Sequence, residues 1–173
     1  ASSLVGSEMC IRDRVIAVDT ETSSLNPQEA DLVGISLCYE ANEAFYIPVG
    51  HTEKTELKKD IVLKKLKPLL EDPSIKKVGQ NIKYDFIIFK NHGIELSSVE
   101  DTMLLSYTLD AGNNRHNMDT LSELHLGHKT ISYKDLVGTG KKQLNFSEVD
   151  LKSATEYAAC LLYTSDAADE CDS

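Results

Sequence analysis

The chain has 173 residues, 41% hydrophobic and 27% charged, and its 18 basic and 28 acidic side chains give a formal net charge of −10. This length and composition fit one globular domain whose core needs neither disulfides nor a structural metal. No apolar run reaches the roughly 20 residues of a transmembrane helix, and charged residues between positions 8 and 13 exclude a continuous secretory signal, so we expect a cytoplasmic protein without a membrane partner.

The first third of residues 15–159 predicts a β-meander. Residues 15–19 form a short apolar run that ends in acids, and residues 32–39 and 44–49 are rich in strand-forming side chains. A polar turn at residues 40–43 separates the last two runs. Short runs joined in this way are typical of antiparallel strands.

The following residues alternate helical and strand patterns. Residues 56–71 predict a helix with apolar positions at Leu57, Ile61, Leu66, Leu69 and Leu70 and a solvated face at Lys58, Lys59, Lys64 and Lys65. Residues 77–79 predict a strand, and the helix expected over residues 84–91 is closed by Gly93. Further helices are expected over residues 102–109, 118–126 and 151–159. This order predicts an α/β fold with one mixed sheet and helices packed on it.

The two ends of the chain differ from the rest. Residues 8–13 and 160–165 can be encoded by reverse-complementary DNA in shifted frames, and both resemble the transposon-end adapter of sequencing libraries. We therefore expect residues 1–14 and 160–173 to be translated adapter around a gene fragment at residues 15–159; natural termini of low information are the alternative. Residues 160–173 hold four acids and no base and residues 1–14 are neutral, which leaves −6 of the charge for residues 15–159.

Asp19 and Glu21 lie two residues apart at the end of a predicted strand, so their side chains leave the same face of the sheet. Two acids on one face repel each other, and a divalent cation such as Mg²⁺ or Mn²⁺ removes this repulsion. Acidic pairs at strand ends are also commonly just solvated, and the motif alone does not decide between the two.

Polar residues fill the junction between the strand at residues 77–79 and the next helix, in the segment QNIKYD. Asp85 is held there beside the core, although an acid in a first helical turn is also common because it interacts with the helix dipole. Asn81 is a candidate substrate contact or only a helix N-cap. Tyr157, on the last predicted helix, is a candidate active-site residue or an ordinary structural tyrosine.

The segments VDTETSSL, GQNIKYD, NRHNMDTLSELHLGHKTISY and ATEYAA resemble, in order and spacing, the 3′→5′ exonuclease domain of bacterial family-A DNA polymerases, the DNA polymerase I type. The resemblance covers residues 15–159 and places the chain in the ribonuclease-H-like DEDD exonuclease superfamily. It implies a mixed five-stranded sheet flanked by helices. It also implies binding of a single-stranded DNA 3′ end, a polymerase domain in the parent chain, and a monomer.

The resemblance implies that four carboxylates hold two divalent ions, which activate a water and stabilise the leaving 3′ oxygen. Asp19 corresponds to the ligand of both ions, Glu21 to a ligand of the first that also contacts the 3′ hydroxyl, and Asp85 to a ligand of the second. Tyr157 corresponds to the tyrosine that orients the water. The fourth carboxylate belongs at position 161, which is Leu161 here.

This departure predicts a severely impaired chain from an active parent, because enzymes are sensitive to small misplacements of reacting groups. Asp166 and Asp169 lie five and eight residues beyond position 161, too far along the chain to substitute.

Six further positions carry over as substrate contacts. Besides Asn81, three of them have an alternative structural role: Leu25 as a core residue, Arg115 in a surface ion pair and Tyr133 in a strand. The full set is Thr20, Leu25, Gln80, Asn81, Arg115 and Tyr133.

Two other functions stay open. A ribonuclease D type enzyme trims RNA with the same carboxylates, although SSLNP after DTET and a meander ending in YIPVGH look more like the polymerase branch. A catalytically inactive structural domain beside a polymerase is the other, although Asp19, Glu21 and Asp85 are all retained.

Overall fold

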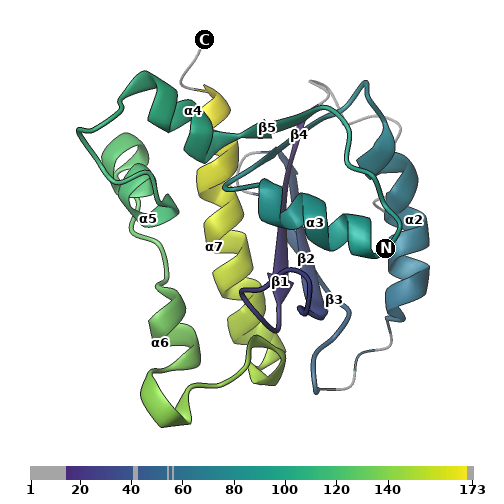
Figure 1. Cartoon of the computed structure of the whole chain (residues 1–173). Coiled ribbons are helices and arrows are strands. Elements are labelled where there is room, and N and C mark those ends of the chain that lie inside the picture. Colours follow the sequence, from purple (N-terminus) through teal and green to yellow (C-terminus); the bar gives the residue numbers. More distant parts are fainter. Residues whose placement is uncertain (1–14, 41–42, 54, 56, 171–173) are drawn as a thin grey trace.

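The computed structural model describes residues 15–40, 43–53, 55 and 57–170. A mixed sheet of five strands forms its centre, in the order β3-β2-β1-β4-β5 (Figure 1). Strands β1, β2 and β3 are antiparallel neighbours, whereas β4 and β5 continue the sheet in parallel with β1. The strands are β1 (Val15–Thr22), β2 (Leu32–Glu40), β3 (Glu43–Pro48), β4 (Lys76–Gly79) and β5 (Val99–Asp101).

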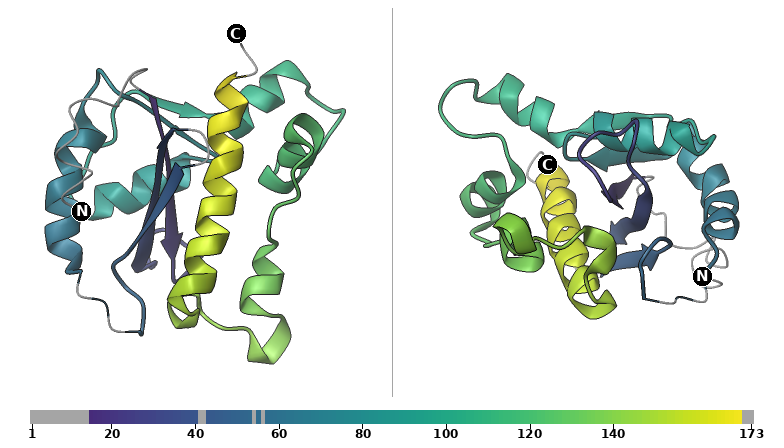
Figure 2. Two further views of the ribbon diagram at one scale, coloured as in Figure 1. Left: turned by 180° about the vertical axis from the view of Figure 1, so that it is seen from behind. Right: turned by 60° about the horizontal axis from the view of Figure 1, so that its bottom comes forward.

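The predicted meander and mixed α/β sheet are therefore confirmed. Strand β5 was not predicted, because three residues are too short for a side-chain period to show in the sequence. Helices cover both faces of the sheet, with α2 (Lys59–Glu71) and α3 (Lys83–Asn91) on one side and α7 (Leu151–Glu170) on the other (Figure 2).

Alternate side chains of β1 pack into the hydrophobic clusters on the two faces of the sheet. Ile16 and Val18 belong to the cluster that includes residues of α2 and α3, and Ala17 packs against Cys38 and Leu162 below α7. Because successive strand residues point to opposite faces, Asp19 and Glu21 lie on the same face as Ala17.

Helix α2 begins at Lys59 and is rotated relative to the predicted apolar face. Val62, Leu63, Leu66 and Leu70 are buried, whereas the predicted core positions Leu57 and Ile61 are exposed. Three of the four lysines predicted to face solvent, Lys58, Lys64 and Lys65, are exposed, and the fourth, Lys59, is partly buried.

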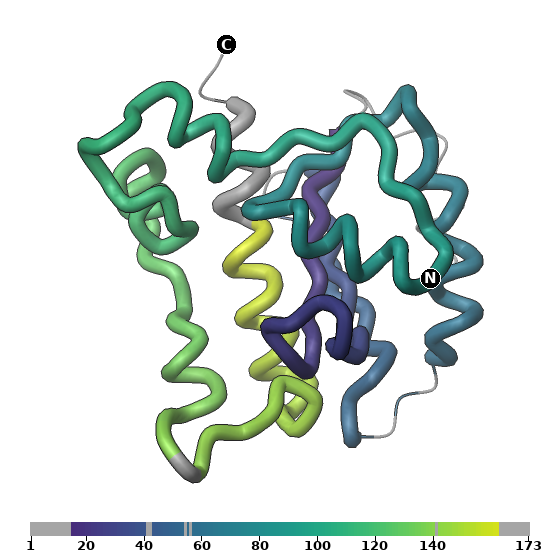
Figure 3. The backbone as a smooth tube through the Cα atoms, in the orientation of Figure 1, coloured from purple at the N-terminus to yellow at the C-terminus, as the bar shows by residue number. Residues whose placement is uncertain are grey.

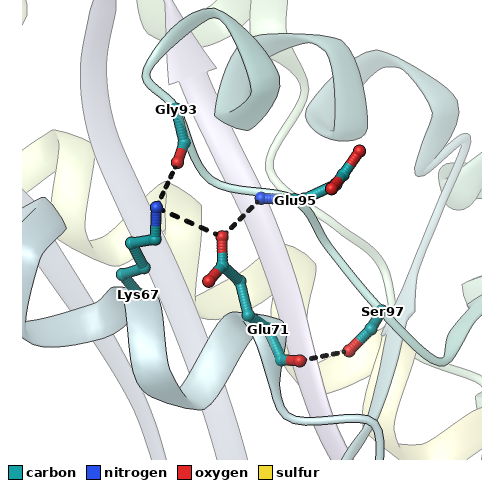
Figure 4. Close-up of polar contacts among 5 residues, drawn as sticks. All are labelled: Lys67, Glu71, Gly93, Glu95 and Ser97. Carbon is teal, nitrogen blue, oxygen red and sulfur yellow. Dashed lines mark hydrogen bonds and ion pairs between the residues drawn. The ribbon is translucent and has the colours of Figure 1, made fainter.

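Polar contacts fix the end of α2 to the segment that follows α3 (Figure 4). Lys67 Nζ donates to the Gly93 carbonyl at 2.7 Å, and Glu71 Oε1 accepts from the Glu95 backbone amide at 3.0 Å. Ser97 Oγ donates to the Glu71 carbonyl at 2.8 Å. These bonds set the position of the chain as it enters β5.

The segment between β5 and α7 forms a layer outside α7 (Figure 3). The predicted helix at residues 102–109 is α4 (Thr102–Leu109), and the one at 118–126 is split into α5 (Met118–Leu121) and a π-helix (Ser122–Leu126). Helix α6 (Tyr133–Val137) and two 3₁₀ turns (Gly140–Lys142 and Phe146–Glu148) were not predicted, since each is about one turn long.

Helix α7 runs to Glu170, beyond the predicted end at residue 159. Residues 160–170 contain neither proline nor glycine, so nothing in the sequence stops the helix. Leu162 is 1% exposed and packs on β1 and β2. None of the described helices is both long and apolar enough to span a bilayer.

Candidate active site

Two carboxylates leave β1 on the face that α7 covers. Asp19 pairs with Ser36 of β2 and Glu21 pairs with Gly34, so the two acids lie beside small residues. Glu21 is 7% exposed, and Asp19 is partly buried. The sequence prediction that these acids share one face of the sheet is confirmed.

Asp85 reaches the same end of β1 from α3. The ladder between β1 and β4 ends at the pair Ala17–Val78. Beyond this pair, the Asp85 side chain hydrogen-bonds to the β1 backbone at Thr20, as a neighbouring strand otherwise would. Its Oδ1 accepts from the Thr20 backbone amide at 2.9 Å and from the Thr20 hydroxyl at 2.5 Å. Thr20 is buried, so its hydroxyl holds Asp85 in position under the other two acids.

The three carboxylates are coupled electrostatically. Burial raises the pKa of Asp19 to about 6. Burial also raises the pKa of Glu21 well above its ordinary value, and the charges of Asp19 and Asp85 add to this rise. The pKa of Asp85 is raised by burial and by Asp19, against the opposing hydrogen bonds from Thr20. The charge of Asp19 therefore disfavours ionisation of both Glu21 and Asp85, and the charge of Asp85 disfavours that of Glu21, as expected for carboxylates that share a site.

The chemistry of this group fits a hard divalent cation. Glu21 Oε1 is buried and has no hydrogen-bond partner among the described residues, so a cation would satisfy it. In the described part of the chain, no three His, Cys, Asp or Glu side chains are gathered closely enough to enclose an ion by themselves. Water and substrate phosphate would therefore have to complete the coordination shell of an ion bound by these acids.

Tyr157 lies beside these acids in an aromatic cluster. Its ring centroid is 6.2 Å from that of Tyr133 and 6.0 Å from that of Phe146, and the side chain is 7% exposed. Burial raises the pKa of the Tyr157 hydroxyl, and so do the charges of Glu21 and Asp19. The structure therefore brings Tyr157 next to the predicted carboxylates.

Tyr133 begins α6, so its interpretation as a strand residue is wrong. The side chain is 41% exposed, and its ring stacks on Phe146 at 6.4 Å. Burial and the nearby Glu21 both raise its pKa. A half-exposed ring beside the acids is available to stack on a nucleotide base.

Leu161 follows Tyr157 by one helical turn and faces the same side of α7. It is partly buried and packs against the cluster of Val33, Val137, Phe146, Val149, Ala154 and Tyr157. A hydrocarbon side chain thus stands where the resemblance places a carboxylate. The side chains of Asp166 and Asp169 lie outside the described part of α7.

Leu25 is 96% exposed, so the alternative that it is a core residue is wrong. The loop that carries it is held firmly. The Tyr84 hydroxyl donates to the Ser24 carbonyl at 2.5 Å, and Asn145 Nδ2 donates to the Ser23 carbonyl at 2.9 Å. Tyr84 was not among the predicted site residues, although it directly precedes Asp85 in the sequence.

The remaining predicted contacts lie around the junction of β4, α3 and α4. Gln80 Nε2 donates to the His116 carbonyl at 2.7 Å, and its Oε1 accepts from the Thr102 hydroxyl at 2.6 Å, so Gln80 holds the segment before α5 in place. Arg115 in that segment is exposed and forms no ion pair with a described residue.

Asn81 is not the N-cap of α3, which is Ile82. Asn81 has a φ of 57°, a left-handed conformation that asparagine tolerates better than most residues, and its backbone amide donates to Asp101 Oδ1 at 3.0 Å. The turn is therefore fixed from β5, and Asp85 is placed in the first turn of α3.

A family model described as 3′-5′ exonuclease matches residues 6–160. The chain is 44% identical over 165 residues to DNA polymerase I of Rhizobium leguminosarum and 46% identical over 151 residues to DNA polymerase I of Pseudomonas aeruginosa. Each alignment covers 84% of this chain and 16% of the relative, so the chain spans about a sixth of the length of these proteins.

Solved structures share the fold. A structure described as the apo form of the nuclease has a TM-score of 0.72 at 21% identity, covering 90% of this chain and 70% of its own. Brucella melitensis NrnC with bound Mg²⁺ has a TM-score of 0.70 at 20% identity, covering 94% and 73%. RNase D of Trypanosoma brucei has a TM-score of 0.70 at 19% identity, covering 93% and 58%. These likenesses establish the ribonuclease-H-like mixed sheet.

Proposed function

Because the chain belongs to the 3′-5′ exonuclease family, we propose that it hydrolyses phosphodiester bonds at DNA 3′ ends with two divalent ions, Mg²⁺ or Mn²⁺. The observation that carries the proposal is the group of three coupled carboxylates, Asp19, Glu21 and Asp85, beside Tyr157. When bound, two ions would clamp the attacking and leaving oxygens of the reaction.

The roles of the protein groups follow from their positions. The charge of Asp19 raises the pKa values of both Glu21 and Asp85, which suits a ligand shared by both ions. Glu21 offers its unpartnered oxygen to the first ion and to the 3′ hydroxyl. Asp85, fixed by Thr20, would hold the second ion. The buried Tyr157 hydroxyl would orient the water by hydrogen bonding.

Substrate contacts are proposed at the exposed rim of this site. Leu25 would wedge against the terminal bases, and the half-exposed Tyr133 would stack on one of them. The exposed Arg115 would contact a phosphate. Thr20, Gln80 and Asn81 are also proposed as contacts of the strand. Within the protein, Thr20 donates to Asp85, Gln80 bonds with His116 and Thr102, and the Asn81 amide donates to Asp101.

We further propose that Leu161 impairs this chain. Replacing a carboxylate by hydrocarbon removes one anionic ligand from the first ion and leaves the attacking water poorly placed. The change Leu161→Asp should restore activity by at least about 100-fold, the scale of a misplacement of about 1 Å. An unmodified chain that already matches the restored one would contradict this proposal.

The biological setting is proposed from the relatives. The matched part of the chain covers only 16% of its DNA polymerase I relatives, so a polymerase domain of the parent chain is the expected partner, in a cytoplasmic monomer. We also propose that residues 1–14 and 160–173 derive from adapter sequence; residues 1–14 lie outside the described structure. Sequencing the source gene across both boundaries tests this, and uninterrupted genomic codons for both segments would refute it.

Matched DNA and RNA oligonucleotides test the substrate class. With the 5′ end labelled and Mg²⁺ or Mn²⁺ present, the Leu161→Asp chain should shorten single-stranded DNA stepwise from its 3′ end. Faster RNA degradation would favour the ribonuclease D alternative, whose fold the chain shares at a TM-score of 0.70 with one such enzyme. No cleavage by the restored chain would favour an inactive structural domain.

A further inference from the structure

A chain of hydrogen bonds connects β3 to the start of α7 next to the carboxylates. The Tyr46 hydroxyl lies 2.6 Å from His51 Nε2, and His51 Nδ1 lies 3.1 Å from the Val149 carbonyl oxygen. The His51 ring also contacts Phe146 of the aromatic cluster at a centroid distance of 5.9 Å. Neither Tyr46 nor His51 has a role in the site described so far.

The direction of these bonds follows from their partners. A backbone carbonyl only accepts, so His51 Nδ1 must carry the proton that it shares with Val149. In a neutral imidazole the other nitrogen is then an acceptor, and the Tyr46 hydroxyl must donate to it. Burial lowers the pKa of His51 below its usual value, which keeps the ring neutral near pH 7. The single hydroxyl hydrogen of Tyr46 therefore points toward His51.

The Tyr46 hydroxyl also lies close to Glu21. Glu21 is directly opposite Gly34 on β2, and residues paired in this way project from the same face. A Cβ added at Gly34 would lie 2.1 Å from the Tyr46 hydroxyl oxygen, so this hydroxyl occupies the space that a larger residue would fill. Burial raises the pKa of Tyr46, and the Glu21 charge adds to this rise, which agrees with this proximity.

Despite this proximity, Tyr46 gives Glu21 no hydrogen bond, and Glu21 Oε1 has no partner among the described residues. We propose that His51 is a positioning residue that holds the Tyr46 hydroxyl hydrogen away from Glu21 and thereby keeps the Glu21 carboxylate available for a divalent cation. This inference rests on the proposed function, because it assigns a cation to Glu21. Without His51, the Tyr46 hydroxyl would turn to Glu21 and compete with the cation.

Mn²⁺ binding to the full 173-residue chain, measured from the electron paramagnetic resonance signal of the free ion, tests the proposal. His51→Asn keeps an amide donor near Val149 but removes the acceptor for Tyr46. Its dissociation constant for Mn²⁺ should rise about three- to tenfold, the factor that corresponds to one net hydrogen bond. Tyr46→Phe alone should bind at least as tightly as the parent.

The double variant His51→Asn/Tyr46→Phe separates positioning from a general structural defect. Removal of the hydroxyl should restore the parental affinity, whereas simple damage to the fold would persist or worsen. His92→Asn, the same change at a partly buried histidine at the C-terminal cap of α3, should leave Mn²⁺ affinity unchanged. Thermal unfolding of all variants without metal checks that each one is folded.

The outcomes distinguish this inference from the proposed function. If the parent chain binds Mn²⁺ and His51→Asn binds it equally well, the positioning role is refuted while the cation site stands. If His51→Asn weakens binding and Tyr46→Phe does not rescue it, the role assigned to Tyr46 is refuted. If neither the parent chain nor the Leu161→Asp chain binds Mn²⁺, both proposals fail.

Discussion

Replacing Asp19 by asparagine should stabilise the cation-free protein at pH 8 and leave its stability nearly unchanged at pH 4. The folded-state pKa of Asp19 is about 6, against an ordinary value of 3.8. A raised pKa means that the folded state favours the protonated acid. The stability that protonated Asp19 contributes is therefore complete below about pH 4 and is lost as the pH rises through 6.

The size of the effect follows from the same difference. A rise from 3.8 to about 6 corresponds to about 3 kcal/mol if the group is fully shielded from water. Asp19 is only partly buried, and screening by solvent reduces this to roughly 1–2 kcal/mol. For a domain of this length, that is an increase of roughly 2–8 °C in Tm.

Thermal unfolding followed by circular dichroism, in EDTA between pH 4 and 8, measures this difference. The gap between Asp19→Asn and the parent should open between about pH 4 and 6.5 and then stay constant. Asp31→Asn, at an exposed acid, serves as the control and should show no such gap. A pH-independent gap, or a less stable Asp19→Asn at pH 8, would show that Asp19 does not share a crowded, buried carboxylate site.

Three further predictions concern the cation, the loop and the sheet. Mn²⁺ at about 100 times its dissociation constant should stabilise the protein by about 3 kcal/mol at pH 8 and hardly at all at pH 4.5, where the carboxylates are protonated. Glu21→Gln should lose most of the stabilisation by Mn²⁺ at pH 8, and an undiminished stabilisation would place the ion elsewhere. Leu25→Ala should change the free energy of unfolding by less than about 0.5 kcal/mol, because the side chain is 96% exposed. In the Leu161→Asp chain, the same change should slow digestion of DNA about tenfold, and unchanged digestion would remove Leu25 from the substrate contacts. Lys77→Met should lower the free energy of unfolding in urea by about 2–4 kcal/mol, because the buried Lys77 Nζ donates to the Asp72 and Ile75 carbonyls at 2.7 and 2.6 Å. Lys76→Met removes a partly exposed ion pair with Glu100 and should cost less than about 1 kcal/mol. Equal costs would refute the role given to the buried amine.

The sequence was sufficient for strands β1 to β4, whose residues are set off by turn residues or by helical patterns, but not for the three-residue strand β5. It was also sufficient for the acidic pair, since strand geometry alone puts Asp19 and Glu21 on one face. Predicting Asp85 in the same site required the family resemblance. The bonds that hold it come from Thr20, 65 residues earlier in the chain, and no local pattern encodes a contact of that separation.

The errors have similar physical causes. The predicted apolar positions Leu66 and Leu70 are buried, but in the first half of α2 the buried residues are Val62 and Leu63 instead of Leu57 and Ile61. The one-turn helix α6 carries too few residues to show a period, so Tyr133 was open to interpretation as a strand residue. The Tyr46 and His51 pair was missed because its significance depends on Gly34, whose missing side chain leaves room for the Tyr46 hydroxyl although its register partner on β3 is Pro48.

The most direct test of the carboxylate site is the rate of 3′ nucleotide release from a single-stranded DNA oligonucleotide by two matched chains. The first carries Leu161→Asp, and the second carries Leu161→Asp together with Asp19→Asn. With Mn²⁺, the first should release nucleotides one at a time from the 3′ end, EDTA should stop it, and the second should be slower by at least about 100-fold. Equal rates for the two chains, or release that persists in EDTA, would contradict a metal-dependent exonuclease site built on Asp19, Glu21 and Asp85.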